Sequence, residues 1–176
     1  MADTEVDWPW QYSFPPFFTL QPHPETREKQ VAAWKSLILE YCKQNRMCII
    51  DVREAHQLPL FNNTTINRKL DSTVIVSILS ELQKTGNAEA IDKGKNRWEV
   101  YWHTREEWAS IIYEYICNNG LQNTVMTLFE INQGDTQDEE FHGLHTDVLI
   151  KVLRVLEDER KCELILSDDD QGVKFF

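Results

Sequence analysis

Two stretches of the chain repeat each other at a spacing of 74 residues, and this repeat constrains the fold more than any other feature. The segment Trp34–Tyr41 aligns with Trp108–Tyr115, and five of the eight positions are identical. A second block aligns at the same spacing: Leu70, Val74, Leu79, Leu82 and Glu89 correspond to Leu144, Val148, Leu153, Leu156 and Glu163. Two blocks in one register indicate a duplicated unit of roughly 75 residues, a size that can form a small domain.

Both units are predicted to contain the same elements in the same order, because apolar residues recur first at helical and then at strand spacing. In the first unit we expect a helix over Glu25–Lys43, a strand over Cys48–Val52, a short helix over Arg53–Leu58, a helix over Ser72–Lys84, and a hairpin of Ala88–Ile91 with Arg97–Trp102. In the second unit we expect a helix from Thr104, a strand over Val125–Leu128, a short helix over Phe129–Ile131, a helix over Thr146–Glu159, and a hairpin of Cys162–Leu166 with Val173–Phe176.

A helix, a short strand, two helices and a hairpin are typical of a winged-helix domain. Thr104 and Glu107 form a capping-box pattern at the start of one predicted helix, and Gly120 follows its end. The predicted fold class is α+β, mostly α: an extended arm over residues 1–24, a winged helix over residues 25–102, and a second winged helix over residues 103–176. We assign Trp34, Trp108, Tyr41 and Tyr115 to the two cores.

Charge is distributed unevenly between the two units. Residues 1–103 hold 12 Lys and Arg against 13 Asp and Glu, whereas residues 104–176 hold 6 against 16, a net charge of −10. DNA and anionic membranes are bound through clustered positive charge, so the second half should be repelled by both. The tip of its predicted wing is Asp168-Asp169-Asp170. A basic protein partner fits this half better.

The sequence contains no pattern that specifies catalysis or a cofactor. Gly-rich phosphate loops and nucleophile elbows are absent, and Cys42, Cys48, Cys117 and Cys162 show no metal-binding spacing. His142 and His145 lie near the acidic run Asp138–Glu140, but a solvated loop is the simpler interpretation. Without such patterns, we expect a non-enzymatic protein that has no cofactor or metal. No leader or membrane-spanning run is recognisable, so we expect the protein to be cytosolic.

The segment Trp8–Pro22 is rich in aromatic residues and proline. Proline biases such a segment towards an extended, polyproline-like shape, and its large apolar side chains must be buried somewhere. Either the arm packs on its own first domain, or it inserts into a partner protein, and the two can coexist.

The arm, together with Leu60–Asn63, Asp138–Gly143 and the ending Gly172–Phe176, resembles the vacuolar protein sorting-associated protein 25 family, the small subunit of the ESCRT-II endosomal sorting complex. The resemblance covers essentially the whole chain. It implies a Y-shaped complex with two copies of this subunit, each attached to one of two larger subunits through P-P-x-Y motifs. Pro15-Pro16-Phe17-Phe18 matches the second motif with Phe18 in place of Tyr, and Pro9-Trp10-Gln11-Tyr12 matches the first with Trp10 in place of the second proline.

The resemblance also implies a function in which the N-terminal part binds the two larger subunits and the second winged helix recruits the ESCRT-III subunit that starts polymer assembly. The chain would then be a scaffold that sorts ubiquitinated cargo into multivesicular bodies, recruited from the cytoplasm to endosomal membranes through the complex. The candidate residues for the larger subunits are Pro9, Trp10, Tyr12, Phe14, Pro15, Pro16, Phe17 and Phe18. For the ESCRT-III subunit they are Asp138, Glu139 and Glu140, with a solvated acidic loop as the competing interpretation.

Two alternatives from other classes remain open at this point. One is a transcription-associated winged-helix factor acting near DNA in the nucleus. The other is a cation-dependent enzyme that uses the region of His142 and His145.

Overall fold

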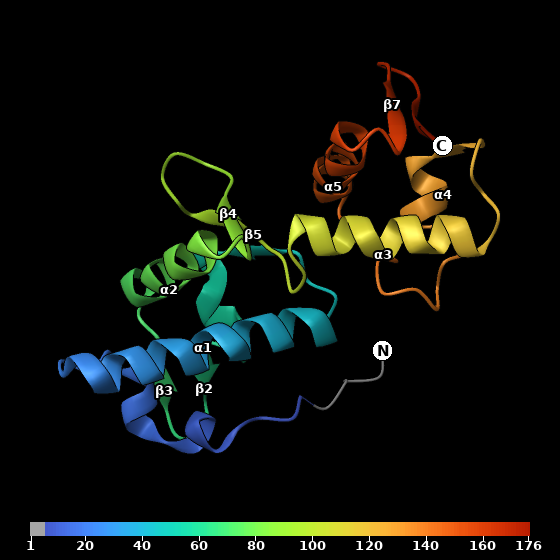
Figure 1. The fold of residues 1–176 in the computed structure, drawn as a ribbon. Coiled ribbons are helices and arrows are strands. Elements are labelled where there is room, and N and C mark those ends of the chain that lie inside the picture. The colour runs from blue at the N-terminus through green and yellow to red at the C-terminus, as the bar shows by residue number, and fades with distance from the viewer. Residues whose placement is uncertain (1–5) are drawn as a thin grey trace. The chain divides into compact units, whose positions relative to one another are not determined.

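The computed structural model describes residues 6–176, and the chain divides after Trp102 into two compact units (Figure 1). Each unit has its own helices and its own three-stranded sheet. The units are described separately below.

The first unit begins with the arm and continues into a helical and sheet-containing domain. Its elements are the 3₁₀ helices η1 (Trp10–Ser13), η2 (Pro15–Phe18) and η3 (Val52–Gln57), the α-helices α1 (Pro24–Gln44) and α2 (Ser72–Lys84), and the strands β1 (Ile49–Asp51), β2 (Asn62–Asn63), β3 (Arg68–Lys69), β4 (Ala88–Ala90) and β5 (Arg97–Val100).

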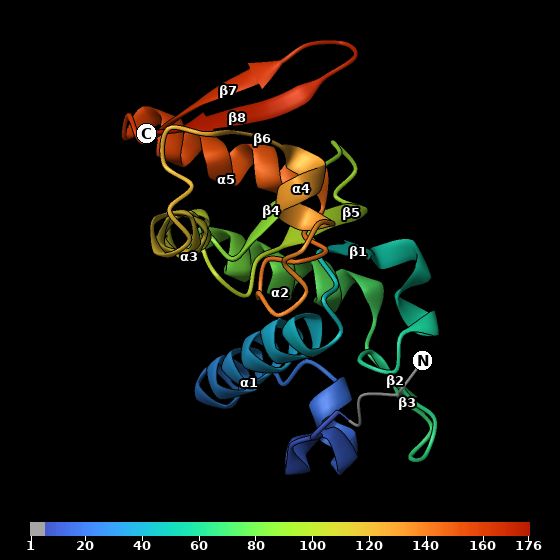
Figure 2. The ribbon, with the colours of Figure 1, turned by 90° about the vertical axis from the view of Figure 1, so that its right-hand side faces the viewer.

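Residues 103–176, the second unit, repeat this order without an arm and without counterparts of β2 and β3. Its elements are the helices α3 (Arg105–Asn118), α4 (Leu128–Asn132) and α5 (Thr146–Asp158), and the strands β6 (Val125–Thr127), β7 (Cys162–Leu166) and β8 (Gln171–Phe175). In Figure 2 the long hairpin of β7 and β8 extends as the wing of this unit.

The two sheets have the same topology. In the first, the antiparallel order is β1-β5-β4, and in the second it is β6-β8-β7. In both, the second strand of the hairpin lies between its hairpin partner and the strand that follows the first helix. Each unit is therefore a winged-helix domain, as the repeat predicts.

Local signals at the helix ends explain why the predicted bounds lie close to those observed. The Thr104 side chain accepts a hydrogen bond from the Glu107 N–H, and Glu107 accepts one from the Thr104 N–H, which confirms the predicted capping box. The same reciprocal pair, Thr127 with Glu130, starts the short helix α4. Gly120 follows α3 with φ of +64°, a conformation that suits glycine at a helix end.

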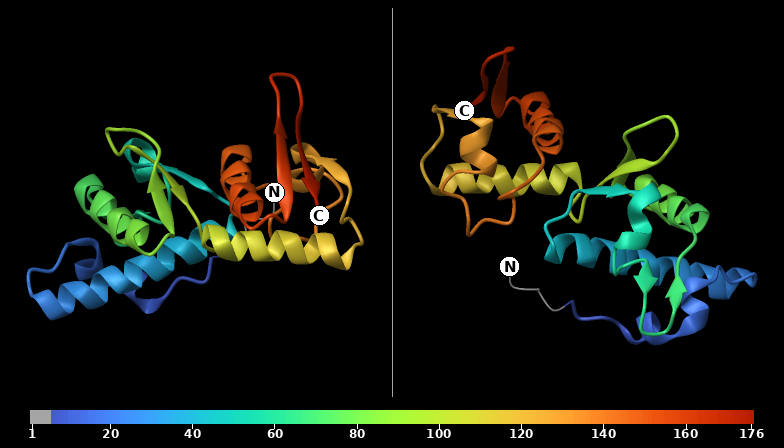
Figure 3. Two further views of the ribbon diagram at one scale, coloured as in Figure 1. Left: turned by 45° about the horizontal axis from the view of Figure 1, so that its top comes forward. Right: turned by 180° about the vertical axis from the view of Figure 1, so that it is seen from behind.

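The arm is more folded than a continuously extended segment. Single turns at Trp10–Ser13 and Pro15–Phe18 alternate with extended backbone at Pro9 and Phe14. Proline is compatible with these turns as well as with extended backbone, because its fixed φ also suits the first residues of a helical turn. Its missing N–H costs nothing there. A further difference from expectation is the two-residue ladder between β2 and β3, which lies beside the arm in Figure 3.

The cores consist largely of the residues predicted from helical spacing. Trp34, Tyr41 and Trp108 are buried, as predicted, whereas Tyr115 is only partly buried and meets Phe141 edge to face, with ring centroids 5.3 Å apart. Three of the four cysteines are buried in these cores, and Cys117 is partly exposed. The second core has this buried set: Trp108, Ile112, Ile116, Val148, Leu149, Val152, Leu153, Leu156, Val173 and Phe175.

Candidate protein-binding site

The structure separates the eight arm residues expected to bind a partner into a buried and an exposed group. The rings of Tyr12, Phe17 and Phe18 are buried in the first unit. The exposed group consists of Pro9, Trp10, Phe14, Pro15 and Pro16. A partner reaches only the exposed group while the arm remains docked, so the two groups have different functions.

Tyr12 fixes the first turn of the arm to the domain. Its hydroxyl donates a hydrogen bond to the Pro59 carbonyl at 2.6 Å, and its ring stacks on Trp8 with centroids 3.8 Å apart. The Asn63 side chain donates to the Tyr12 carbonyl at 2.7 Å. Burial, with a smaller contribution from Tyr41, raises the pKa of the Tyr12 hydroxyl, which keeps it protonated as a donor.

Phe17 and Phe18 fix the second turn by packing on Trp34 of α1. The Phe17 ring stacks on the indole, and the Phe18 ring meets it edge to face with centroids 5.4 Å apart. The indole N–H of Trp34 also donates to the Phe17 carbonyl at 2.9 Å. Trp34, which is part of the sequence repeat, thus anchors the arm both through its ring and through its indole N–H.

Gln30, one helical turn before Trp34, hydrogen-bonds the backbone of the arm. Its amide nitrogen donates to the carbonyls of Phe17 (2.9 Å) and Thr19 (2.8 Å), and its amide oxygen accepts from the Gln21 N–H at 3.0 Å. A buried amide with these partners is satisfied and fixes the backbone direction. Sequence reasoning did not identify Gln30 or Asn63. For Gln30 the available signal was a polar residue four positions before Trp34, on the face of the helix that is otherwise buried.

The exposed aromatic rings project from this fixed backbone. Trp10 is 72% exposed and Phe14 is 48% exposed, and their ring centroids lie 5.7 Å apart. They border a largely apolar hollow of about 600 Å³ whose other side is α1, including Lys29 and Ala33. Large apolar rings held at fixed positions around a hollow are suited to binding an apolar side chain of another protein.

The acidic run Asp138–Glu140 lies in the loop between α4 and α5 of the second unit. The loop is held by buried Phe141 and by the Thr136 hydroxyl, which donates to the Ile131 carbonyl and lies 2.9 Å from His142 Nδ1. Glu140 contacts His103, with 2.7 Å between Oε1 and Nε2. Asp138 is exposed, whereas Glu139 and Glu140 are half-buried.

The region of His142 and His145 does not gather metal ligands in the structure. Within residues 6–176, no group of three or more His, Cys, Asp or Glu side chains is arranged to hold a metal ion. His145 instead caps α5 by accepting from the Asp147 N–H. None of the helices in this described range is both long and apolar enough to cross a bilayer.

The second unit presents negative charge where a DNA-reading winged helix presents positive charge. Asp168, Asp169 and Asp170 are exposed at the tip of the wing. A phosphate backbone beside them would be repelled, and no counterions would be released to favour binding. The geometry of this unit therefore suits a basic partner.

Comparison with known proteins identifies where this architecture occurs. A family model described as "ESCRT-II complex subunit" matches residues 11–145. Vacuolar protein-sorting-associated protein 25 of Xenopus laevis is 48% identical over 171 residues, which are 97% of this chain and 98% of that protein. The protein of the same name from Danio rerio is 49% identical with the same coverage, and that from Drosophila melanogaster is 42% identical over 173 residues, 98% of this chain and 99% of that protein.

Solved structures agree with the sequence comparison. A crystal structure of subunit VPS25 of the endosomal trafficking complex ESCRT-II superposes with a TM-score of 0.86 at 30% identity, covering 96% of this chain and 98% of that one. A crystal structure of the endosomal complex ESCRT-II (VPS22/VPS25/VPS36) gives a TM-score of 0.83 at 30% identity, covering 95% of this chain and 98% of the matched chain.

Proposed function

The chain belongs to the vacuolar protein sorting-associated protein 25 family of ESCRT-II complex subunits, and on this basis we propose that it is a non-enzymatic scaffold with two binding ends. The N-terminal arm attaches to the two larger ESCRT-II subunits, and the second winged helix recruits the ESCRT-III subunit that starts polymer assembly. The protein acts on the cytoplasmic side of endosomal membranes, in sorting ubiquitinated cargo into multivesicular bodies, and reaches the membrane through the complex.

The observation that carries the proposal is the exposed pair Trp10 and Phe14. The backbone that carries them is fixed by Tyr12 and Asn63 on one side of Phe14 and by Trp34 on the other. Ordering an aromatic side chain at an interface costs conformational entropy, and this cost is smaller when the backbone beneath it is already fixed. Two preorganised rings beside an apolar hollow can therefore act as an anchor for a partner's apolar side chain.

The buried aromatic residues support attachment indirectly. Tyr12 and Phe18 occupy the terminal aromatic positions of the two proline–aromatic motifs, yet their rings pack inside the first unit. Phe18 lacks the hydroxyl of the tyrosine in the motif. Its buried, apolar surroundings suit a phenylalanine ring, which has no polar atom that needs a hydrogen-bond partner. We assign these two residues, with Phe17, to positioning the arm.

Recruitment by the second unit is proposed from its charge. Residues 104–176 carry a net charge of −10. Asp138 is exposed and Glu139 is half-buried in a loop that is held by Phe141 and Thr136. A basic helix of the ESCRT-III subunit would gain in association rate and in specificity from this field.

Co-purification with the two larger ESCRT-II subunits, with mass measured by light scattering, tests the attachment. The variant Trp10→Ala/Phe14→Ala removes two exposed rings and should be lost from the complex. Phe129→Ala is the matched control, because Phe129 is a 68% exposed ring in the second unit. The control should enter the complex in two copies, as the unmodified chain should. Equal entry of all three proteins would place the attachment elsewhere and refute the role of the arm.

Recruitment is tested separately with the purified ESCRT-III subunit. Asp138→Asn/Glu139→Gln removes two charges from the loop, and Asp168→Asn/Asp169→Asn removes two from the wing. We expect the loop variant to bind about 3- to 10-fold more weakly, with a smaller salt dependence. Weaker binding by the wing variant alone would move the contact to the wing, and no change in either variant would refute a charge-based contact at both places.

A further inference from the structure

The hollow between the arm and α1 has an apolar part and a polar part. The exposed rings of Trp10 and Phe14 border it from the arm, and Ala33 adds apolar surface from α1. Thr26 and Lys29, from the beginning of α1, line the same hollow. A protein segment that enters the hollow therefore meets aromatic rings from the arm and side-chain donors from the helix.

Lys29 gives the hollow its charge. Among the described residues that line it, Lys29 alone is charged, and the others are apolar, proline, threonine or glutamine. Lys29 is exposed and forms no salt bridge within residues 6–176. The nearest acids along α1 are Glu25 and Glu28, which are exposed, do not line the hollow and are not paired with Lys29. The ammonium group is therefore available to a partner.

Thr26 provides a second donor beside Lys29. Residues three apart on a helix lie on the same side, so the hydroxyl and the ammonium face the hollow together. The amides of Gln21 and Gln30, which also line the hollow, already donate to carbonyls of the arm. A carboxylate has two oxygens that accept hydrogen bonds, and bonds from a charged donor are stronger than neutral ones. A carboxylate thus matches the free donors of this hollow.

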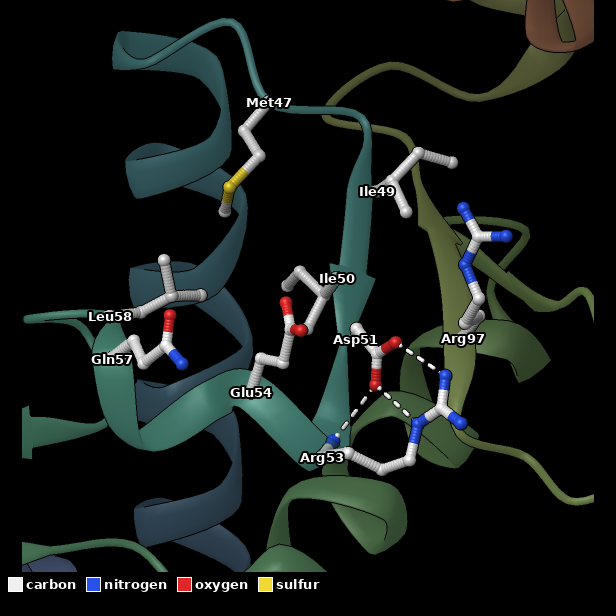
Figure 4. A pocket seen from close by; sticks show the side chains of 9 residues that line it. All are labelled: Met47, Ile49, Ile50, Asp51, Arg53, Glu54, Gln57, Leu58 and Arg97. Atoms are coloured by element: carbon white, nitrogen blue, oxygen red, sulfur yellow. Dashed lines mark hydrogen bonds and ion pairs between the residues drawn. The ribbon is translucent and has the colours of Figure 1, made fainter.

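Another hollow of the first unit, about 540 Å³ beside β1, shows the opposite case (Figure 4). Arg53 and Arg97 line it together with Asp51 and Glu54, and the Arg53 guanidinium lies 2.7 Å from the Asp51 carboxylate. Charges of both signs give that hollow no preference for a ligand of one charge. The hollow beside the arm differs because its lining carries one sign only.

The spacing along α1 sets the distance between the two parts of the hollow. Ala33 follows Lys29 by four residues, which is about 6 Å along the helix axis. A bulky apolar side chain over Ala33 and a carboxylate at Lys29 are thus close enough to belong to one short segment of a partner. Side chains three or four residues apart on a helix, for example, have about this separation.

From this geometry we propose that Lys29 selects the segment of the larger ESCRT-II subunits that enters the hollow. The segment places a bulky apolar side chain against Trp10 and Phe14, and an aspartate or glutamate of the same segment accepts from Lys29 and Thr26. This inference rests on the proposed function, because it specifies the partner's side of the attachment through the arm. The rings supply contact area, and the ammonium disfavours segments with a basic residue at this position.

Titration calorimetry of the full chain with the purified larger subunits tests the charge. Lys29→Glu should weaken binding about tenfold, because it places like charges together. Lys29→Met keeps the apolar stem and should weaken binding about threefold, with a smaller salt dependence. Lys43→Glu makes the same charge reversal at an exposed position near the other end of α1 and should leave the affinity unchanged.

Carbodiimide crosslinking of the assembled complex identifies the partner's carboxylate. The reagent joins an amine to a carboxylate in contact with it as an amide, and the water removed converts the carbodiimide to a urea. Mass spectrometry should find Lys29 joined to an aspartate or glutamate that has a bulky apolar residue within four positions. Lys29→Arg keeps the charge but lacks the amine, so it should bind like the unmodified chain and lose this crosslink.

The outcomes separate this inference from the proposed function. If Lys29→Glu binds as tightly as Lys43→Glu while Trp10→Ala/Phe14→Ala is lost from the complex, the arm attaches the partner and the selection by Lys29 is refuted. A complex that forms without any crosslink at Lys29 also overturns the selection. If Trp10→Ala/Phe14→Ala binds normally, the proposed attachment itself fails.

Discussion

The Phe17 ring lies parallel to the Trp34 indole, with centroids 4.3 Å apart and an angle of 3° between the planes. This stacking joins the arm to α1 in the core of the first unit, where Phe17 is only 5% exposed. The arm therefore contributes to the stability of the domain, and mutations in it fall into two classes.

Replacing Phe17 by alanine should destabilise the chain far more than replacing Phe14. Phe17→Ala leaves a cavity against Trp34 and should lower the free energy of unfolding by about 3–5 kcal/mol. Phe14→Ala removes a half-exposed ring and should cost less than about 1 kcal/mol. Urea unfolding followed by tryptophan fluorescence measures both. Equal costs would mean that the arm does not pack on Trp34 in solution.

Replacing Gln30 by leucine should loosen the arm while leaving the rest of the domain folded. The change removes the Gln30 donor from the carbonyls of Phe17 and Thr19, and it leaves the Gln21 N–H without its acceptor, at a cost of about 1–3 kcal/mol. Limited proteolysis should then cut within residues 10–22 faster than in the unmodified chain. Gln83→Leu, on the exposed end of α2, is the control and should not change the cleavage rate.

Acid should weaken the second domain through Glu157. Its carboxylate accepts from the Leu164 N–H at 2.7 Å and from Arg154 at 2.9 Å, and these bonds, the backbone one foremost, lower its pKa below the ordinary value for glutamate. A carboxyl group with a lowered folded-state pKa stabilises the fold above its unfolded-state pKa of about 4.3, and this contribution disappears as the pH falls through the folded-state value.

The measurement is urea unfolding of the unmodified chain and of Glu157→Gln between pH 7 and pH 3. The variant should be less stable at pH 7, and the difference should shrink towards pH 3. A difference that is constant with pH would show that Glu157 acts through packing alone.

The thiols should differ sharply in reactivity. Burial, and to a smaller extent Glu157, raises the pKa of the Cys162 thiol to about 12, and burial raises that of Cys42 well above its ordinary value. Reaction requires the thiolate and access to it, so iodoacetamide at pH 8 should modify the native chain at partly exposed Cys117 alone. Mass spectrometry of peptides identifies the site. Labelling of Cys162 before unfolding would contradict the burial of the second core.

The four long helices were predictable because their apolar spacing and end signals agree. The predicted range Ser72–Lys84 coincides with α2, and Thr104 caps α3 as expected. The ladder of Asn62–Asn63 with Arg68–Lys69 was not predictable, since two polar residues on each side provide no alternation. The burial of Phe17 and exposure of Phe14 could not be separated either, because both are phenylalanines beside proline and only the position of Trp34 distinguishes them.

Separating the two faces of the arm has a consequence for how this subunit can change over evolutionary time. Substitutions at Tyr12 or Phe17 carry a folding cost, so the inward face is constrained whatever the partner. Substitutions at Trp10 or Phe14 carry little folding cost, so the outward face is free to follow changes in the proteins it meets. The partner specificity of the arm can therefore change through Trp10 or Phe14 without compensating mutations in the core.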